Sequence, residues 1–473
     1  MIEAPEDPQS PPPERSRTWA DTLSKGLFIF SLCLGSLLYG VLAGHYGFFP
    51  HQQLKDAKAG AEALVAVLSG EPPPSPSDIP GFPATESTIK DHANQDDGAL
   101  ILVSGGAGYL TSIHEHGCLA WLMDRQGRIL HVWKNDPELW ADMTHVETLP
   151  SVSHIYPVGV HLLPDGGLIV TFQAIASWPF AVGMARFDKD SNLIWKQPYY
   201  AHHWFAITDD EKIITPSLQL IESPAPIGNT RGRIVSDDGR DIMADTVTVM
   251  SLDGEILEEI SMLDALDRSG YIGLYQGGAI DSPLAQTKDP LHLNAVLPVP
   301  EEVAAAHDWL NAGDLMVSYR SLNSIAILDR ETSDVKWLCA GKTLRQHSPR
   351  FFGADHILAF DNLGGDESLG GSRIVKINLE TQHAETVFPT AENQPEHTVF
   401  SYASGHLDLS PDQSRVLMAV TMQSMILEID LQSGELLWEY RFVDSGTQMP
   451  QPIHTANYCY DVTFEMNQPE AGQ

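Results

Sequence analysis

Residues 120–133, AWLMDRQGRILHVW, have the pattern of a β-hairpin, because apolar residues alternate on both sides of a turn that contains Asp124 and Gly127. The same pattern returns five more times along the chain. The later copies are GMARFDKDSNLIW (183–195), TVTVMSLDGEILEEI (246–260), SIAILDRETSDVKW (324–337), RIVKINLETQHAETV (373–387) and MILEIDLQSGELLWEY (425–440). Such a regular return of one supersecondary unit is typical of a repeat architecture.

A second strand-forming phrase lies between successive copies, for example GVHLLPDGGLIVTF (159–172) and GHLDLSPDQSRVLMAV (405–420). Two hairpins in each repeat make a four-stranded blade, so six repeats predict an all-β fold, the six-bladed β-propeller. We expect the strand at residues 99–104 (ALILVS) to pair with C-terminal strands and close the ring. A pair of β-sandwich domains is the alternative fold, and the six correlated copies favour the propeller.

An apolar run occupies residues 26–49 (GLFIFSLCLGSLLYGVLAGHYGFF), and it contains no Asp, Glu, Lys or Arg. This length is sufficient to cross a bilayer. The run begins later and extends further than the apolar core of a cleaved signal peptide, which favours an uncleaved anchor. Basic residues precede it at Arg15, Arg17 and Lys25, so the positive-inside rule places the N-terminus in the cytoplasm and the rest of the chain outside.

These features divide the chain into five parts. We expect a cytoplasmic tail at 1–25, a transmembrane anchor at 26–49, a short helix (55–69) with a Pro-rich linker at 50–97, a propeller at 98–464 and a tail at 465–473.

The charge balance excludes a nucleic-acid partner, because 63 Asp and Glu oppose 28 Lys and Arg, for a net charge of −35. Within this acidic chain, residues 336–350 (KWLCAGKTLRQHSPR) hold four basic residues and no acid, which predicts a local patch suited to sulfate or phosphate. No CxxC pair and no complete P-loop occur, so we expect no metal and no nucleotide cofactor.

Propellers carry their functional residues at the mouth of the central channel. Four polar residues occupy comparable places near the entries of inner strands: His203 in AHHWF, His292 in DPLHLNAV, Arg320 in SYRSLNSI and His347 in RQHSPRF. We therefore expect them to converge at one end of the channel.

DPLHLNAV (289–296), SYRSLNSI (318–325) and QHSPRF (346–351) are the most specific pieces of a wider likeness that covers most of residues 100–464. In these pieces the chain resembles the bacterial arylsulfotransferase family of the type that uses no nucleotide sulfate donor. The resemblance implies a six-bladed propeller exported to the periplasm, attached here to the inner membrane by one helix.

The family's active site has three histidines and one arginine, which the resemblance carries to His292, Arg320, His347 and one histidine of the pair 202–203, taken as His203. Relatives commonly have an acid after this histidine, whereas this chain has Trp204. The segment EEVAAAHDWLNAG (301–313) is a second difference, expected to reshape the mouth.

The resemblance implies ping-pong sulfuryl transfer from an aryl sulfate donor to a phenolic acceptor, without a cofactor. Neutral His347 would attack sulfur and form a sulfo-histidine, while Arg320, His292 and His203 contact the sulfuryl oxygens and one histidine protonates the leaving phenolate. We also expect four residues to contact the substrate: His202, Asn294, Lys342 and Arg345. A non-catalytic binding propeller, a sulfate or phosphate ester hydrolase and a metalloenzyme built on the same histidines are the alternatives.

Overall fold

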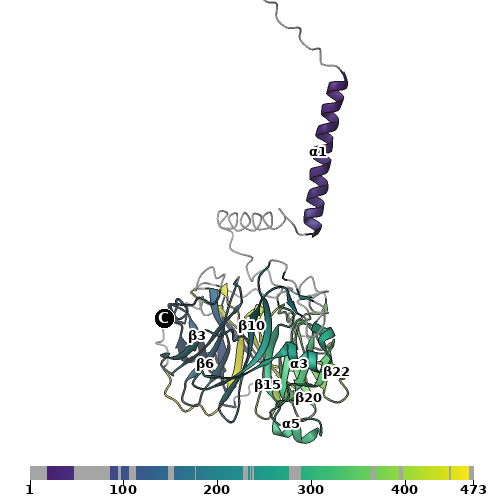
Figure 1. Cartoon of the computed structure of the whole chain (residues 1–473). Coiled ribbons are helices and arrows are strands. Elements are labelled where there is room, and N and C mark those ends of the chain that lie inside the picture. Colours follow the sequence, from purple (N-terminus) through teal and green to yellow (C-terminus); the bar gives the residue numbers. More distant parts are fainter. Residues whose placement is uncertain are drawn as a thin grey trace, which may run out of the picture. The chain divides into compact units, whose positions relative to one another are not determined.

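The chain forms two compact units in the computed structural model, Met1–Ser75 and Pro76–Gln473 (Figure 1). The structure describes residues 19–46, 86–93, 97–105, 113–146, 154–175, 177–226, 233–234, 236, 239–275, 289–363, 369–393, 398–446 and 449–467.

The first unit contains helix α1 (Trp19–Tyr46). Its segment Leu23–Gly40 has a mean hydropathy of 1.5 and no buried side chain, so by length and composition it suits a bilayer, as the apolar run predicted. The helix begins at Trp19, seven residues before the predicted start of the apolar run. The predicted short helix at 55–69 and the two chain ends, 1–18 and 468–473, lie outside the described residues.

The second unit is a six-bladed β-propeller, which confirms the predicted fold. Each blade is an antiparallel sheet, and the strand named first in each lines the central channel. The blades are β29 (Thr455–Cys459), β2 (Leu100–Ser104), β3 (Cys118–Met123) and β4 (Ile129–Lys134); β5 (Ile155–Leu162), β6 (Leu168–Ala174), β7 (Ala181–Phe187) and β8 (Leu193–Gln197); β9 (Ala206–Ile207), β10 (Lys212–Ile221), β13 (Ile242–Ser251) and β14 (Ile256–Ser261); β15 (Leu293–Pro298), β16 (Leu315–Tyr319), β17 (Ser324–Leu328) and β18 (Val335–Ala340); β19 (His347–Phe352), β20 (His356–Asp361), β21 (Arg373–Asn378) and β22 (Ala384–Phe388); β23 (His406–Leu409), β24 (Arg415–Val420), β25 (Met425–Asp430), β26 (Leu436–Arg441) and β1 (Thr88–Asp91).

Short elements decorate the blades. They are the ribbons β11 (Ala225–Pro226) with β12 (Arg233–Ile234) and β27 (Val443–Asp444) with β28 (Met449–Pro450), the helices α3 (Met262–Arg268) and α5 (Glu301–Ala306), and the 3₁₀ helix η6 (Thr421–Gln423).

The repeated Asp or Asn of the sequence pattern shapes the outer hairpin in five of the six blades. The Asp124 carboxylate accepts the backbone N–H of the residue two positions later at 3.0 Å, which closes an Asx turn between β3 and β4. The equivalent residues Asp188, Asp329, Asn378 and Asp430 make the same contact at 2.9–3.1 Å. At the reversal of the chain, this polar side chain thus accepts a backbone N–H that has no partner strand.

A repeated tryptophan ties four of the six blades to the next. The buried indole of Trp133 donates to the carbonyl of Gly166 in the following blade at 3.0 Å. Trp195, Trp337 and Trp438 make the same kind of bond to Leu252, Leu379 and Arg125 at 2.7–3.0 Å. A large apolar side chain with one donor suits this position, because the ring fills the space between two sheets and its N–H is satisfied.

The ring closes through both ends of the unit. β29 pairs with β2 from Leu100↔Cys459 to Ser104↔Thr455, which confirms the predicted partner of residues 99–104. β1 also adds a fifth strand to the last blade by pairing with β26, so the propeller includes residues 88–91 of the segment predicted as linker. The sequence did not predict this strand, because four residues, two of them charged, show no clear alternation of apolar side chains.

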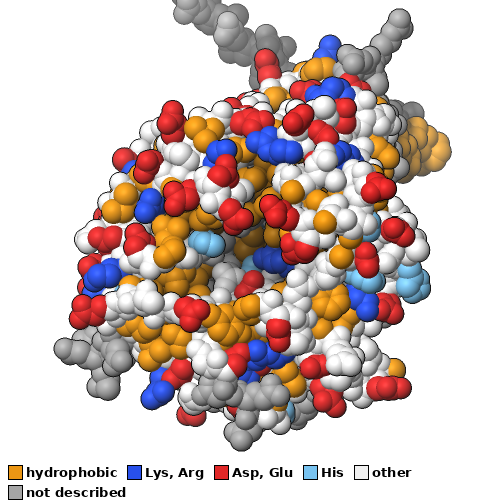
Figure 2. Space-filling model, turned by 90° about the horizontal axis from the view of Figure 1, so that it is seen from below, with side chains coloured by type: hydrophobic (Ala, Val, Ile, Leu, Met, Phe, Trp, Pro, Cys, Tyr) orange, Lys and Arg blue, Asp and Glu red, His pale blue; other side chains and the backbone are white. Residues whose placement is uncertain are grey.

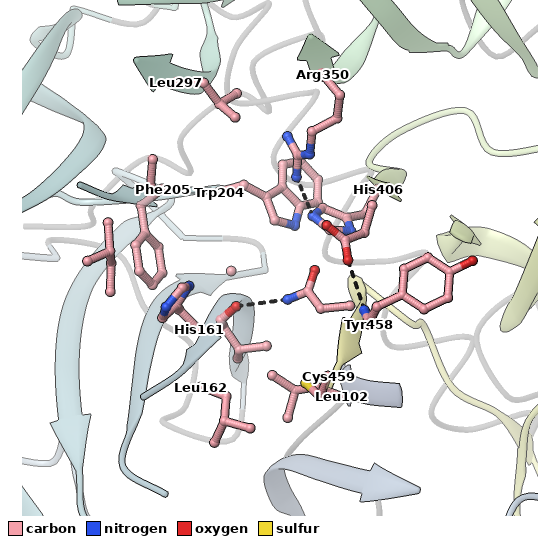
Figure 3. Close-up of a pocket in the computed structure, with 16 residues that line it drawn as sticks. Leu102, His161, Leu162, Trp204, Phe205, Leu297, Arg350, His406, Tyr458 and Cys459 are labelled. Atoms are coloured by element: carbon pink, nitrogen blue, oxygen red, sulfur yellow. Dashed lines mark hydrogen bonds between the residues drawn. The ribbon is translucent and has the colours of Figure 1, made fainter. Parts of the chain in front are cut away.

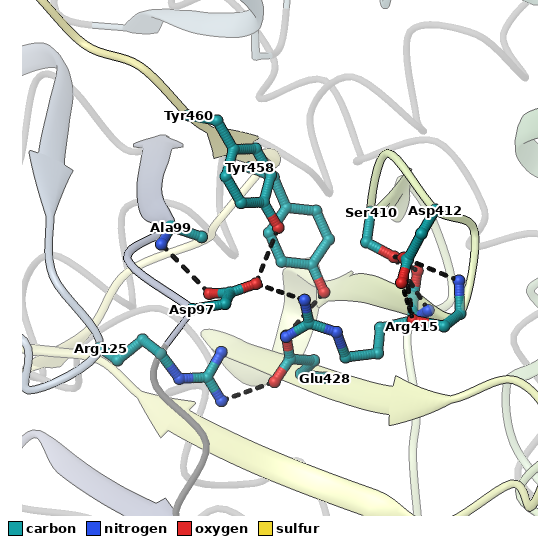
Figure 4. Close-up of polar contacts among 10 residues, drawn as sticks. Asp97, Ala99, Arg125, Ser410, Asp412, Arg415, Glu428, Tyr458 and Tyr460 are labelled. Atoms are coloured by element: carbon teal, nitrogen blue, oxygen red, sulfur yellow. Dashed lines mark hydrogen bonds and ion pairs between the residues drawn. The ribbon is translucent and has the colours of Figure 1, made fainter.

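A buried ion-pair cluster reinforces this closure (Figure 4). The Glu428 carboxylate accepts from Arg125 at 2.6 Å, from Arg415 at 3.1 Å and from the Tyr458 hydroxyl at 2.7 Å. Arg415 in turn pairs with Asp97, just before β2. The cluster thereby joins the first blade, the last blade and the C-terminal strand.

Candidate active site

A cavity of about 340 Å³ lies at one end of the channel. It is lined by Tyr156, Gln173, Ile175, Phe180, His203, His292, Arg320, His347, Tyr402, Ala403, Ser404, Met422, Pro452 and His454. The four predicted catalytic residues His203, His292, Arg320 and His347 are all among them. The convergence expected from the sequence is therefore present.

The starts of inner strands position the three histidines. His347 is the first residue of β19, and His292 immediately precedes β15. His203 and His292 both have left-handed backbones, with φ of 56° and 51°, which non-glycine residues adopt rarely and mostly where the surrounding fold enforces it. These turns direct both rings toward one point, and their centroids lie 5.1 Å apart.

Arg320 reaches the cavity from a different kind of position than predicted. It follows β16, the second strand of the blade that begins with His292, instead of opening an inner strand of another blade. Its backbone N–H donates to the carbonyl of His292 at 3.1 Å, so the two residues are held side by side. The antiparallel ladder explains this, since the end of a second strand returns to the end where the first strand began.

The tautomer of His347 follows from its partner Asn362. The amide nitrogen of Asn362 donates to the carbonyls of Ser401 and Ser404 at 2.8 and 2.7 Å, which leaves its amide oxygen facing His347 Nδ1 at 2.7 Å. An amide oxygen only accepts, so Nδ1 carries the proton and the lone pair of neutral His347 is on Nε2. Burial and the charge of Arg320 lower the pKa of His347 well below its usual value, which keeps the ring neutral.

His203 has the opposite tautomer. The Tyr156 hydroxyl donates to Gln173 Oε1 at 3.2 Å, so the Gln173 amide nitrogen is the group that faces His203 Nδ1 at 3.0 Å. His202 Nδ1 lies 2.7 Å from the same atom. Nδ1 of His203 therefore accepts, and its Nε2 carries a proton that can be donated. Burial, followed by neighbouring charges, lowers the pKa of His203 well below its usual value.

His292 is paired with an acid. Its Nδ1 lies 2.5 Å from the Asp289 carboxylate, three residues earlier in the chain. Burial opposes ionisation of Asp289, but His292 and Arg320 outweigh it and lower the pKa of that carboxyl. On its other side the ring stacks on Phe180, with centroids 5.4 Å apart and an interplanar angle of 25°. The carboxylate accepts the Nδ1 proton and fixes the orientation of the ring, which leaves Nε2 for a ligand in the cavity.

Arg320 supplies the positive charge of the cavity. Burial and the nearby Arg345 lower its pKa, yet a guanidinium stays protonated at neutral pH. Among the described residues no carboxylate approaches Arg320 within ion-pair distance. Its charge is therefore available to an anionic ligand.

The four residues predicted to contact substrate do not line this cavity as far as the structure is described. His202 lies behind His203, fully buried, with Nε2 4.0 Å from Asp245. Asn294 is also fully buried and donates to the carbonyl of Gln346 at 2.8 Å, so it supports the strand that precedes His347. Lys342 is exposed and Arg345 half-buried on the loop before that strand.

The predicted basic patch at 336–350 is not one surface. Lys336 forms ion pairs with Asp314 and Asp329, both at 2.8 Å, on the outer strand β18. Arg350 lies on β19 and faces a different cavity from His347. A run of residues that leaves one blade and enters the next passes from the outer edge of the propeller to the channel, so neighbours in sequence separate in space.

The insertion 301–313 was expected at the mouth, and this is wrong. It contains α5 and connects β15 to β16 at the end where Pro298 pairs with Leu315. His292 and Arg320 lie at the opposite end of the same two strands.

Three supporting residues were missed from the sequence: Asp289, Asn362 and Gln173. Only Asp289 had a signal, because an acid three residues before a candidate histidine is within reach of its ring. The partners of His347 and His203 come from other strands, 15 and 30 residues away, and no spacing rule connects them.

Trp204, the departure noted in the sequence, packs beneath the site. Its indole centroid lies 5.9 Å from the ring of His347, and its N–H donates to Thr455 Oγ1 at 2.9 Å. Among the described residues, no group of three His, Cys, Asp or Glu side chains is arranged to hold a metal ion.

The comparison with solved structures gives distant matches. A protein of unknown function from Bacteroides caccae is 10% identical, with a TM-score of 0.44 and coverage of 77% of this chain and 99% of that chain. A putative 6-phosphogluconolactonase from Bacteroides fragilis is 13% identical, with a TM-score of 0.40 and the same coverage. Virginiamycin B lyase from Staphylococcus aureus is 12% identical, with a TM-score of 0.33, covering 60% and 70% of the two chains. No curated protein sequence matches.

The comparison with family models is specific. The model described as "Arylsulfotransferase (ASST)" matches residues 159–443. This confirms the resemblance carried by the segments around His292, Arg320 and His347, which all lie inside the match. Since the match covers more than half of the chain, the protein belongs to the arylsulfotransferase (ASST) family.

Proposed function

We propose that the chain transfers a sulfuryl group from an aryl sulfate to a phenol by a ping-pong route through His347. The observation that carries the proposal is the convergence of a neutral histidine of fixed tautomer, an arginine available to an anion and two further histidines in one cavity. At about 340 Å³, the cavity suits a small ligand of one aromatic ring.

In the first half-reaction the sulfate group lies against Arg320, and Nε2–H of His203 donates to a sulfuryl oxygen. Nε2 of His347 uses its lone pair to form an N–S bond as the ester S–O bond breaks. The electron pair of that bond goes to the phenolate oxygen. Positive charge and donors at the sulfuryl oxygens favour this step, because charge persists there in the transition state.

We assign the general acid to His292. The Asp289 carboxylate at 2.5 Å stabilises its imidazolium, so Nε2–H can protonate the departing phenolate. In the second half-reaction the neutral ring accepts the proton of the acceptor phenol, whose oxygen attacks sulfur and releases His347. The aromatic side chains of Phe180 and Tyr156 line the same cavity and suit an aryl ring.

The test uses the full chain in detergent with a chromogenic aryl sulfate, with and without phenol. Phenol-dependent release that disappears in His347→Ala and persists in the control Lys342→Ala supports transfer, because Lys342 is exposed and outside the cavity. A burst of about one phenolate per protein without acceptor supports the covalent intermediate.

Other outcomes point to the alternatives. Continuous release without phenol indicates an ester hydrolase. No release with any aryl sulfate from folded protein overturns the proposal, and a stoichiometric metal in that preparation would favour the metalloenzyme.

We further propose that α1 anchors the chain and that the propeller lies outside the cytoplasm, in the periplasm. The apolar segment Leu23–Gly40 and the basic residues before it support this orientation. Protease added to intact spheroplasts should degrade the propeller, whereas protection until lysis would contradict the orientation.

A further inference from the structure

A second cavity, of about 310 Å³, lies at the other end of the channel (Figure 3). All inner strands run from the active-site end toward it: β5 contributes His161, β15 Leu297, β19 Arg350 and β23 Asp408. Figure 2 shows the propeller face on this side, which is hollowed at its centre, with histidine and basic side chains visible in the hollow. The cavity is thus open to solvent and separate from the active site.

Arg350 is the cation of this cavity, and the hydrogen-bond partners that the described residues offer its guanidinium are neutral. Nη1 donates to the carbonyl of Pro349 at 3.0 Å, and Nη2 lies 2.8 Å from His406 Nε2. His406 Nδ1 lies 3.2 Å from the carbonyl of Ala456, so it carries the proton and Nε2 accepts from Arg350. His406 is therefore neutral and contributes no charge that would compete with or balance Arg350.

No carboxylate lies within ion-pair distance of Arg350 in the described part of the chain. The acid that lines the same cavity, Asp408, accepts instead from the backbone N–H of Tyr458 at 2.8 Å. Burial raises the pKa of Asp408 to about 6, and Arg350 opposes that rise. Asp408 therefore acts on Arg350 through space without contacting it, and the guanidinium lines a cavity in which an anion would pair with it directly.

The walls are apolar and aromatic. Phe205, Leu297 and Leu162 line the cavity together with the indole of Trp204. His161 also faces it with ring nitrogens that have no partner among the described residues, and burial lowers its pKa to about 4, so the ring is neutral. A flat apolar body with one acidic group would satisfy both the walls and Arg350.

Trp204 separates the two cavities. Its ring centroid lies 5.5 Å from His406 on one side and 5.9 Å from His347 on the other. A ligand in the second cavity would therefore contact the side chain that supports the nucleophile of the first.

We propose that the second cavity binds a small organic anion, an aromatic carboxylate or aryl sulfate, whose acidic group pairs with Arg350 and whose ring packs against Trp204 and Phe205. The site does not depend on the proposed transfer reaction, since its residues lie at the opposite end of the channel.

Titration calorimetry of the full chain in detergent tests the proposal, with benzoate and phenyl sulfate as the two probes. The background variant His347→Ala prevents turnover of phenyl sulfate without touching the second cavity. The chain should then bind two equivalents of an anion that fits both ends, or one equivalent of an anion that fits only the second cavity. The probe that binds identifies carboxylate or sulfate as the preferred group.

Two matched variants assign the sites. Arg350→Gln should weaken binding of the anion at the second cavity by at least about tenfold, because a charge-assisted hydrogen bond contributes on this scale. Arg320→Gln should leave the affinity of the second cavity unchanged. Asp408→Asn, which removes the opposing carboxylate, should tighten it severalfold at pH 8. This gain tests the site even if Arg350→Gln does not fold.

Three results would overturn the proposal. The first is no binding of either probe at about 10 mM, a concentration that nearly saturates even a site with a Kd of about 1 mM. The others are binding that Arg320→Gln abolishes and Arg350→Gln does not change, and an affinity that falls in Asp408→Asn.

Discussion

The tautomer of His347 makes Asn362 the residue whose replacement is most informative. Asn362 does not line the cavity in the described structure, and its amide oxygen contacts only the proton-bearing nitrogen of His347, at 2.7 Å. Asn362→Asp keeps the size of the side chain and places a carboxylate at Nδ1, and it also removes the two hydrogen bonds that the amide nitrogen donates to the carbonyls of Ser401 and Ser404. We expect this change to raise the pKa of His347 and move the acid limb of the pH–rate profile upward.

The size of the shift follows from the contact. A carboxylate within hydrogen-bond distance of an imidazole raises its pKa by about 1–3 units, equivalent to roughly 1.4–4 kcal/mol. In the native chain, burial and Arg320 hold the pKa of His347 well below its usual value, so the reactive neutral form persists into acid. In the proposed mechanism only neutral His347 attacks sulfur. A raised pKa of His347 therefore removes the reactive form at higher pH, and activity is lost first on the acid side.

The assay measures the burst of phenolate in the first half-reaction, without acceptor, between pH 4.5 and 8.5. Asn362→Ala provides the complementary change: it removes the acceptor, so the rate should fall about tenfold or more without an upward shift of the limb. Ser372→Ala is the control for a purely structural effect. The Ser372 hydroxyl donates to the Ser401 carbonyl, which also accepts from Asn362, but in the described structure Ser372 does not contact His347.

An unchanged acid limb in a folded Asn362→Asp variant would refute the reasoning, because it would mean that residue 362 does not face the Nδ1 proton. An equal shift in Ser372→Ala would show that loop distortion, and not charge, moves the profile.

Three further changes test other parts of the structure. Asp289→Asn should slow transfer by about 10²–10⁴-fold for phenyl sulfate and far less for nitrophenyl sulfate, whose leaving group needs no proton. The rate should therefore depend more steeply on the pKa of the leaving group. An unaltered dependence would mean that the Asp289–His292 pair is not the general acid. Glu428→Gln should lower the free energy of unfolding by about 3–5 kcal/mol in urea titrations, since it leaves the buried Arg125 without its carboxylate, while Arg415 keeps Asp97. A loss below about 1 kcal/mol would mean that the cluster does not secure ring closure. Gly159→Ala places a Cβ 2.5 Å from the carbonyl oxygen of His203 and should reduce activity about tenfold or more. Gly273→Ala, with open space around it, should not. Equal activity of the two variants would mean that close packing of Gly159 against His203 does not matter for the site.

The local pattern of the sequence determined the blades. Alternating apolar residues form strands wherever one face is buried, and an acid at the reversal closes an Asx turn regardless of its surroundings, as Asp124 and Asp430 do. The apolar run that became α1 is equally local. Three histidines that carry family motifs could also be placed at one end of the channel, because a propeller brings equivalent ends of its inner strands together. Arg320 joins them for a different reason, since it follows the second strand of a blade.

The tertiary structure decided which residues share an end of the channel. His347 and Arg350 are three residues apart, but an extended strand rises about 3.3 Å per residue, so β19 carries them to opposite cavities. The same strand direction places the insertion 301–313 away from the mouth and brings Arg320 back beside His292.

The protonation of the site is likewise a tertiary property. His347 and His203 are identical side chains in the sequence, and they differ through the groups that distant segments present to Nδ1: the Asn362 amide oxygen for the first and the Gln173 amide nitrogen for the second. These partners meet because the sheets close into a ring. Hydrogen-bond geometry across that ring, which no local pattern encodes, leaves one histidine with a free acceptor nitrogen at Nε2 and another with an N–H there.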